Sequence, residues 1–271
     1  MKKQLYFYLI LLAMIVVAMV VIRNYNNEPE VGVRDLPKIK HEGVLRMAAD
    51  YNSVELHAQA DSMAGFQYEL ARAFSDFIGV EIEIYPVSSI EESLNGLMDN
   101  RYDIVARLIP VTVQLKEQFN ASKPFLTSKH VLVQRIPQSD VDSPLIRNQL
   151  HLANKTLYIP GNSSVRTRLS NLIKEIGDTI YIVEDPLYQD EQLIQMVATG
   201  VIDYAVVDEH IAKRILSSYP GVDIETDISF AQLNSWITRK DSPVLMDSIN
   251  SFIEQFKNSS KFKELKERYL H

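Results

Sequence analysis

A phrase that occurs twice in the 271 residues limits the folds open to this chain. Residues 97–105 read LMDNRYDIV, and residues 196–207 read MVATGVIDYAVV. Each copy reads as the apolar end of a helix, an Asn or Gly suited to a left-handed helix end, and an Asp that leads into a β-branched strand. Two copies predict two similar α/β lobes. Chains built in this way place a ligand in the cleft between the lobes, at the carboxyl ends of the strands.

The segments before the first copy alternate between strand and helix patterns. Residues 43–50 predict a strand that ends in the carboxylate of Asp50. Residues 65–78 carry apolar side chains at helical spacing, which predicts a helix with one buried face. Residues 80–87 alternate Ile with Glu as a strand does, and residues 90–98 predict the helix that leads into the first copy. This βαβαβ order favours a parallel sheet with right-handed crossovers.

The same order follows before the second copy. Residues 156–159 predict a strand, residues 160–164 a turn, and residues 165–176 a helix. A strand at 180–183 and a helix at 189–198 complete the second lobe. The two halves of the chain therefore predict the same architecture.

The end of the chain is expected to return to the first lobe. A strand-like segment at 234–238 is followed by two helix patterns, at residues 243–256 and 261–269. Crossings near residues 128–133 and 230–236 would join the lobes, and two connecting strands make a hinge. Trp236 lies near the second crossing and is expected to pack rather than to contact a ligand. The predicted domains are a membrane or signal segment at 1–23, a tether at 24–41, lobe 1 from 42–129 and 232–271, and lobe 2 from 130–231.

An apolar run near the N-terminus predicts where the protein resides. Residues 5–22 contain no charge, Gly or Pro, and such a helix would span roughly 27 Å, enough to cross a bilayer. Lys2 and Lys3 are expected to stay cytoplasmic, which places the rest on the far side. We expect a cell-envelope protein, anchored by a transmembrane helix in the inner membrane with its soluble domain in the periplasm. A cleaved signal segment, which would release it into the periplasm, stays open.

Composition excludes several functions. A formal charge of -7 without a basic stripe argues against nucleic-acid binding. The absence of cysteine excludes disulfides and thiolate chemistry. The six histidines form no i,i+4 zinc pair, and no phosphate-binding or dinucleotide-binding fingerprint is present. We therefore expect no metal, no cofactor and no catalysis.

Two motifs resemble those of family 3 of the extracytoplasmic solute-binding proteins. Residues 65–74 read GFQYELARAF, like the family phrase G-F-x-x-E-L-A-x-A-F. Thr112, followed by SKPF at 122–125, resembles the family pattern T-x-x-R … F-S-x-P-Y. The resemblance runs from about His41 to the C-terminus. It implies a bilobal α/β fold of the periplasmic-binding-protein type, with a two-strand hinge and a ligand in the cleft.

A closer likeness follows Gly200. Residues 202–208, the turn at 219–220, Trp236 and residues 267–271 resemble the non-catalytic sensor half of the membrane-bound lytic murein transglycosylase F family. In that family a lysozyme-like catalytic domain follows at this point. Because glycan cleavage needs a carboxylic acid in the groove of such a domain, we expect this chain to bind and not to cleave.

The resemblance implies a ligand site built from both lobes. Asp208 occupies the place of the aspartate that holds the ligand ammonium, and a carboxylate in a cleft recognises cations well. Asn162 and Ser163 lie where amides at a helix N-terminus would hold a carboxylate. Asp50 and Tyr51 match the polar or aromatic wall of lobe 1. Helix capping and an ordinary turn are the alternative explanations of these residues.

The carboxylate clamp of the family is incomplete in this sequence. Leu115 stands where the family has the arginine of T-x-x-R, although Thr112 is present and remains a candidate ligand-binding residue. Leu108 and Pro110 replace positions that often supply a small residue and a hydroxyl. Arg107, at a strand end, could substitute as a fork-shaped donor, or it could be an ordinary exposed arginine.

The predicted function is an extracytoplasmic module that closes on an amino acid, a peptide or a cell-wall peptide. It would act as a transport receptor for a membrane permease or as a regulatory sensor for a cell-wall enzyme. The alternatives are a degenerate fold that serves as an envelope scaffold or partner-binding protein, and, third, a lytic transglycosylase. A dry cleft filled with apolar side chains would favour the scaffold.

Overall fold

The computed structural model describes residues 14, 34–139 and 143–270. Apart from Met14, the expected membrane segment at 5–22 lies outside these residues. The chain divides into one unit at Met1–Arg34 and a second at Asp35–His271, and the second carries the fold described below. Within the described part of the chain, no helix has the length and hydropathy needed to span a membrane.

The last part of the expected tether is folded. Helix α2 (Leu36–Glu42) begins at Asp35, whose carboxylate accepts a hydrogen bond from the Leu36 amide at 2.7 Å. The same carboxylate accepts the amides of Val244 and Leu245 at the start of a C-terminal helix. The side chains of Leu36 and Ile39 in α2 are buried. The prediction of a tether up to residue 41 was therefore too long, because these contacts tie α2 to the fold.

The first sheet has the strand order β4-β1-β5-β14-β6. Strand β1 pairs in parallel with β4 and β5, whereas β14 runs antiparallel to β5 and β6. Its strands are β1 (Val44–Ala49), β4 (Glu81–Pro86), β5 (Ile104–Val105), β6 (Phe119–Ala121) and β14 (Ile237–Arg239). The predicted βαβαβ order with a parallel sheet is confirmed for β1, β4 and β5.

The second sheet repeats this plan with the order β10-β9-β11-β8-β12. Strand β9 pairs in parallel with β10 and β11, and β8 runs antiparallel to β11 and β12. Its strands are β8 (His130–Arg135), β9 (Thr156–Pro160), β10 (Tyr181–Asp185), β11 (Tyr204–Asp208) and β12 (Val222–Asp227). We call the elements around the first sheet lobe 1 and those around the second sheet lobe 2.

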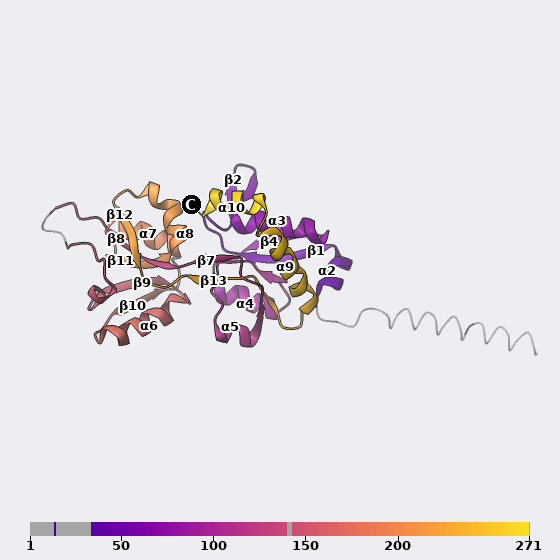
Figure 1. The fold of residues 1–271 in the computed structure, drawn as a ribbon, viewed down its shortest axis with the longest axis horizontal. Coiled ribbons are helices and arrows are strands. Elements are labelled where there is room, and N and C mark those ends of the chain that lie inside the picture. Colours follow the sequence, from indigo (N-terminus) through magenta and orange to yellow (C-terminus); the bar gives the residue numbers. More distant parts are fainter. Residues whose placement is uncertain (1–13, 15–33, 140–142, 271) are drawn as a thin grey trace, which may run out of the picture. The chain divides into compact units, whose positions relative to one another are not determined.

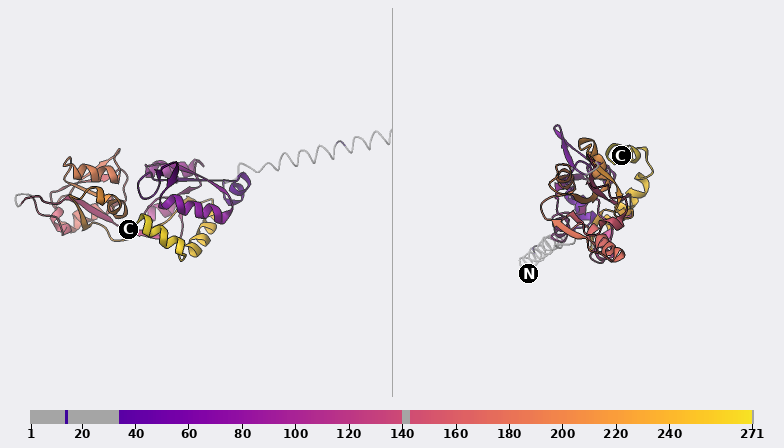
Figure 2. Two further views of the ribbon diagram at one scale, coloured as in Figure 1. Left: turned by 90° about the horizontal axis from the view of Figure 1, so that it is seen from above. Right: turned by 90° about the vertical axis from the view of Figure 1, so that its left-hand side faces the viewer.

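The helices gather in two groups, one around each sheet (Figure 1). Figure 2 shows the C-terminal helices, in yellow, beside the helices of lobe 1. Lobe 1 also contains α3 (Phe66–Ile78), α4 (Ile90–Met98), α5 (Val113–Gln118), α9 (Pro243–Phe256) and α10 (Ser260–Tyr269). Lobe 2 contains α6 (Val165–Ile176), α7 (Asp190–Ala198) and α8 (Glu209–Ile215), with short 3-10 turns at Gln149–Leu152 and Leu216–Ser218.

Two short strand pairs complete the described part of the fold. Strands β7 (Leu126–Ser128) and β13 (Gln232–Asn234) form an antiparallel pair between the two groups of elements (Figure 1). The chain passes between the lobes at these strands, close to both expected crossings. Strands β2 (His57–Gln59) and β3 (Ser62–Ala64) form a hairpin before α3 that the sequence patterns did not predict.

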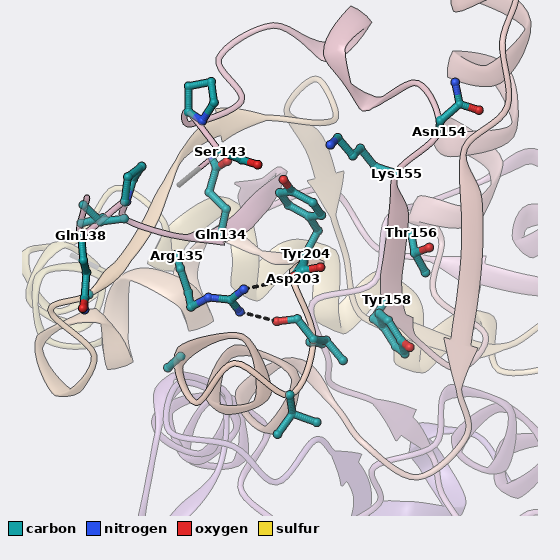
Figure 3. A pocket seen from close by; sticks show the side chains of 17 residues that line it. Gln134, Arg135, Gln138, Ser143, Asn154, Lys155, Thr156, Tyr158, Asp203 and Tyr204 are labelled. Atoms are coloured by element: carbon teal, nitrogen blue, oxygen red, sulfur yellow. Dashed lines mark hydrogen bonds and ion pairs between the residues drawn. The ribbon is translucent and has the colours of Figure 1, made fainter. Parts of the chain in front are cut away.

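The repeated phrase folds in the same way in both lobes. Asn100 has φ 56° and Gly200 has φ 79°, so each helix ends in the expected left-handed residue. Beside each turn an arginine side chain donates hydrogen bonds to main-chain carbonyls on both sides of the turn. We call this arrangement the arginine clamp. Arg135 donates to the carbonyls of Val197 and Ile202 at 3.0 and 2.7 Å and pairs with Asp203 at 2.5 Å (Figure 3).

The equivalent clamp in lobe 1 is buried. Arg239 donates to the carbonyls of Leu97 and Tyr102 at 3.2 and 2.5 Å and pairs with the fully buried Asp103 at 3.5 Å. Each arginine comes from the strand that runs antiparallel to the strand after the repeat. The internal symmetry therefore extends from the backbone to side-chain contacts.

Trp236 lies in the core of lobe 1. Its ring is fully buried against Phe74, Phe125 and Phe252, with ring centroids 5.7 to 6.4 Å apart. The indole N–H donates to Gln67 Oε1 at 2.8 Å, which satisfies its one polar group. The expectation that Trp236 packs is confirmed.

Candidate functional site

A small cavity of about 60 Å³ lies between the lobes, where strands β1, β9 and β11 end. Because β9 and β11 run in parallel, their carboxyl ends meet at the same edge of the sheet. The residues that line this inner cavity include Asp50, Glu55, Arg107, Leu108 and Pro110 from lobe 1, and Pro160, Gly161, Ser163, Asp190 and Asp208 from lobe 2. A second, outer cavity of about 340 Å³ shares Asp50 and Asp190 with it.

Arg107 is held by its own lobe. It pairs with Asp50 at 3.0 Å and donates to the carbonyls of Val87 and Ser88 at 2.5 and 2.9 Å. The side chain is buried, so the interpretation as an ordinary exposed arginine was wrong. The remaining hydrogen bond, to the Ser93 hydroxyl at 3.4 Å, also stays within lobe 1. The guanidinium is therefore occupied before any ligand arrives.

Glu55 is a buried acid of the cavity wall that the sequence patterns did not indicate. Its Oε2 accepts the Leu108 amide at 3.0 Å and its Oε1 accepts the Asn52 side chain at 3.4 Å. Burial raises the pKa of Glu55 well above its usual range, and the nearby carboxylate of Asp50 raises it further. Burial also raises the pKa of Asp50, against the opposing charge of Arg107.

Two aspartates of lobe 2, Asp190 and Asp208, line the same cavity as these acids. Asp208 accepts the His210 amide at 2.8 Å and so caps α8, and its own amide points to Asp190 Oδ1 at 3.4 Å. Burial raises the pKa of Asp190 to about 8, and the charges of Asp208 and Asp50 add to this effect. Asp208 is thus a helix cap and a cavity residue at once. Asp190, like Glu55, was missed from the sequence.

The inner cavity is acidic on balance. Four carboxyl groups, from Asp50, Glu55, Asp190 and Asp208, face the guanidinium of Arg107. His130 also lines the cavity, but burial lowers its pKa and keeps it neutral near pH 7, against the charge of Asp208. Buried carboxylates are costly without a counter-charge, so the arrangement is suited to a cation.

Of the two residues of the expected anion-binding turn, the structure places only Ser163 in the lining of the cavity. Its hydroxyl accepts the Val165 amide at 3.4 Å. Asn162 has φ 57° and does not line the cavity. Its amide points to Glu184 Oε2 at 3.4 Å, and its side chain to Glu91 Oε2 at 3.3 Å. Carboxylates of this protein thus already occupy the donors of Asn162.

The other expected ligand-binding residues lie outside the inner cavity. Tyr51 is exposed and lines the outer cavity. Thr112 caps α5, where its hydroxyl accepts the Leu115 amide at 3.1 Å. Neither Thr112 nor Leu115 is among the residues that line either cavity. The structure therefore brings Asp50, Arg107, Ser163 and Asp208 together, places Tyr51 beside them, and leaves Asn162 and Thr112 apart.

Hydrogen bonds between described residues cross from one lobe to the other. The Arg214 side chain of α8 donates to the Arg268 carbonyl of α10 at 3.3 Å, and two more lie around the cavities. The Ser53 amide of lobe 1 donates to Glu191 Oε1 of lobe 2 at 2.8 Å. The other is the contact between Asn162 and Glu91. Both lie among residues around the cavities, so the lobes are closed on each other in this structure.

A larger cavity of about 830 Å³ lies elsewhere on lobe 2. Its lining residues include Lys155, Thr156 and Tyr204, at the amino ends of β9 and β11, and the clamp between Arg135 and Asp203 (Figure 3). Ligands of open α/β sheets bind at the opposite, carboxyl edge. We therefore place the candidate site at the acidic cavity between the lobes.

Two α/β lobes, a two-strand connection and a polar cavity between them define a bilobal binding protein of the periplasmic type. Residues 44–271 match the family model of the bacterial extracellular solute-binding proteins, family 3. The chain belongs to this family.

Relatives and solved structures agree with this assignment. The chain is 28% identical over 236 residues to the membrane-bound lytic murein transglycosylase F of Aeromonas salmonicida, covering 87% of this chain and 46% of that protein. The corresponding protein of Desulfosudis oleivorans is 25% identical over 237 residues, covering 88% and 51%. The chain therefore spans about half the length of the relatives it matches.

Solved structures share the fold. The amino acid ABC transporter substrate-binding protein AbpA of Streptococcus pneumoniae, bound to L-arginine, has a TM-score of 0.73 at 22% identity, over 86% of this chain and 96% of that one. Holo ArgBP from T. maritima has a TM-score of 0.71 at 20% identity, over 87% and 99%. At these identities the likeness establishes the bilobal architecture.

Proposed function

We propose that this chain is a binding module of the cell envelope that closes on a small, amine-bearing solute and does not catalyse a reaction. The observation that carries the proposal is the cluster of four carboxyl groups between the lobes, at the carboxyl ends of the strands. A cationic group of the ligand would supply the counter-charge that these acids lack. Asp208, Asp50, Arg107 and Ser163 would line the site. The ligand would be an amino acid, a peptide or a cell-wall peptide.

The role we favour is that of a regulatory sensor. The relatives named as membrane-bound lytic murein transglycosylase F match this chain over most of its length, which supports a module that responds to cell-wall peptides and modulates a cell-wall enzyme. A transport receptor that serves a permease is the second candidate, favoured by the likeness to an ABC transporter substrate-binding protein. The apolar run at 5–22 supports an inner-membrane anchor for either role.

The lining of the inner cavity supports binding over a purely structural role. A degenerate scaffold was expected to fill its cleft with apolar side chains, whereas acids, serines and a histidine line this cavity. Leu108 and Pro110 also line it, so part of the wall is apolar, as in most ligand sites.

A thermal-shift scan of the full chain in detergent tests this proposal. The probes are amino acids, amines and cell-wall peptides, since a ligand at 100 times its Kd adds about 2.7 kcal/mol of stability. We expect a shift with one class of probe and its loss in Asp208→Asn, which keeps a capping side chain on α8. No shift with any class would contradict a binding function and favour the scaffold.

A further inference from the structure

The chemistry of the inner cavity also limits the kind of ligand. We propose that this site selects an organic amine without a free carboxylate, of the alkyl diamine or guanidino-amine type. This inference rests on the proposed binding function and narrows its ligand class. Three observations carry it: the charge of the cavity, the occupation of the donors of Arg107 and Asn162, and an unpartnered buried oxygen.

The charge of the cavity calls for a ligand with net positive charge. Asp50 already pairs with Arg107, so Glu55, Asp190 and Asp208 remain without a charged partner among the lining residues. A zwitterionic amino acid would bring a carboxylate into this cluster and leave the balance unchanged. A dication would neutralise two of the remaining acids and add no negative charge.

Among the described residues that line the inner cavity, the one arginine is already committed, so no uncommitted guanidinium faces a ligand carboxylate. Leu115 replaces the arginine expected from the family motif, and Arg107 is held by Asp50 and two carbonyls of lobe 1. At the turn before α6, Glu91 and Glu184 already lie against the donors of Asn162. A ligand carboxylate at that turn would have to displace Glu91 and the ion pair between Glu184 and Arg166, which costs binding free energy.

One oxygen of the cluster is buried and has no partner. Asp50 is 7% exposed, its Oδ2 pairs with Arg107, and its Oδ1 accepts no hydrogen bond from the described residues. Asp50 lines both the inner and the outer cavity. Such an oxygen is costly to bury, and an ammonium N–H is the donor that would satisfy it best.

The outer cavity is suited to the rest of an amine. Tyr51 of lobe 1 and Leu187 and Tyr188 of lobe 2 line it together with Asp190 and Glu191. Aromatic faces and an apolar side chain accommodate an alkyl stem and a second cationic head. Among the described residues, no three acids or histidines are arranged to hold a metal ion. These features favour an organic cation over a divalent metal.

Matched pairs of ligands test the inference by calorimetry on the full chain. Each pair consists of an amino acid and its decarboxylated amine: lysine with cadaverine, and arginine with agmatine. We expect at least one amine to bind about tenfold or more tightly than its parent amino acid. Equal or tighter binding of the amino acid would overturn the inference and leave the proposed binding function standing. If neither pair binds while a cell-wall peptide does, the inference also fails alone. Failure of every probe would overturn both.

Two variants separate the acidic cluster from general effects. Asp190→Asn removes a carboxyl group that can ionise when an amine binds, and we expect the amine affinity to fall about 10- to 100-fold, as for the loss of a charge-assisted hydrogen bond. Asp247→Asn removes an exposed carboxylate on α9, away from both cavities, and should leave the affinity unchanged. Unfolding midpoints without ligand verify that both variants fold. An equal loss of affinity in the two variants would mean that overall charge, and not this site, attracts the amine.

Discussion

Asp190 should make the folded chain less stable as the pH rises. Burial and the charges of Asp208 and Asp50 raise its pKa from 3.8 to about 8. Between these two pH values the folded state holds a proton that the unfolded state has released. The contribution of Asp190 to stability is therefore greatest below pH 3.8 and falls by up to about 1.4 kcal/mol per pH unit until the folded pKa is passed.

The substitution Asp190→Asn isolates this contribution. Asn has nearly the shape of a protonated Asp and does not ionise, so the difference between the two proteins cancels the titration of Glu55 and Asp50 to first order. If the whole pKa shift contributes to stability, the free energy of unfolding of the variant should rise by about 4 kcal/mol relative to that of the unchanged chain between pH 5 and 8. Because Asp190 is half-buried and the lobes can separate about the hinge, water relieves part of this cost. We expect a gain of at least about 1 kcal/mol.

Urea unfolding at pH 5, 6, 7 and 8 measures the difference. Trp236 fluorescence reports the transition, because the buried indole becomes exposed on unfolding. Asp247→Asn serves as the control, since that carboxylate is exposed. A stability difference between Asp190→Asn and the unchanged chain that stays constant across this range would refute the assignment of a strongly raised pKa to Asp190.

Three further predictions follow from individual contacts. Asp208→Asn should weaken an amine ligand by about 1.5 to 3 kcal/mol in calorimetry, and unchanged affinity would remove Asp208 from the site. Arg239→Ala removes the guanidinium that pairs with the fully buried carboxylate of Asp103 and should cost about 3 to 5 kcal/mol in urea unfolding. Arg135→Ala removes the half-exposed clamp of lobe 2 and should lower the free energy of unfolding by about 1 kcal/mol or less. Equal losses of stability in the two variants would contradict this reasoning. Gly65→Ala should cost roughly 2 to 4 kcal/mol, because φ is +129° and a Cβ would lie 2.3 Å from a backbone carbonyl oxygen; a thermal midpoint close to that of the unchanged chain would count against it.

The parts of the fold that follow from the sequence are those with local causes. Helices α6 and α9 begin and end where their periodic patterns predict, and the left-handed residues Asn100 and Gly200 lie where the repeated phrase places them. The hairpin β2–β3 was not predicted, and the strands of the hinge were expected only as crossings near residues 128–133 and 230–236. Each of these strands has three residues, too few for a periodic signal, and each is fixed by its partner strand.

The site was predictable only where a residue ends a strand. Asp50 and Asp208 follow β-strand patterns, and the carboxyl ends of such strands meet at one edge. Glu55 lies in an irregular segment, and Asp190 begins a helix, where an acid is common for reasons of the helix dipole. Neither residue carries a local signal of burial. Their closeness arises from packing one lobe against the other, which no single segment encodes.

Because of the same acids, a rise in pH should lower the stability of the empty, closed cleft and increase its affinity for an ammonium ligand. In the closed, empty cleft, a pKa of about 8 means that Asp190 carries a proton near neutral pH, and burial shifts the pKa of Glu55 in the same direction. An ammonium ligand binds best to the ionised carboxylates, so its binding must release protons, and its affinity should rise with pH up to about the pKa of Asp190. Over that range the empty closed state loses stability. Two of the bonds that cross between the lobes, from Ser53 to Glu191 and from Asn162 to Glu91, lie around the cavities, have neutral donors and are of modest strength. A cation that replaces the protons would therefore add to the contacts that hold the lobes together.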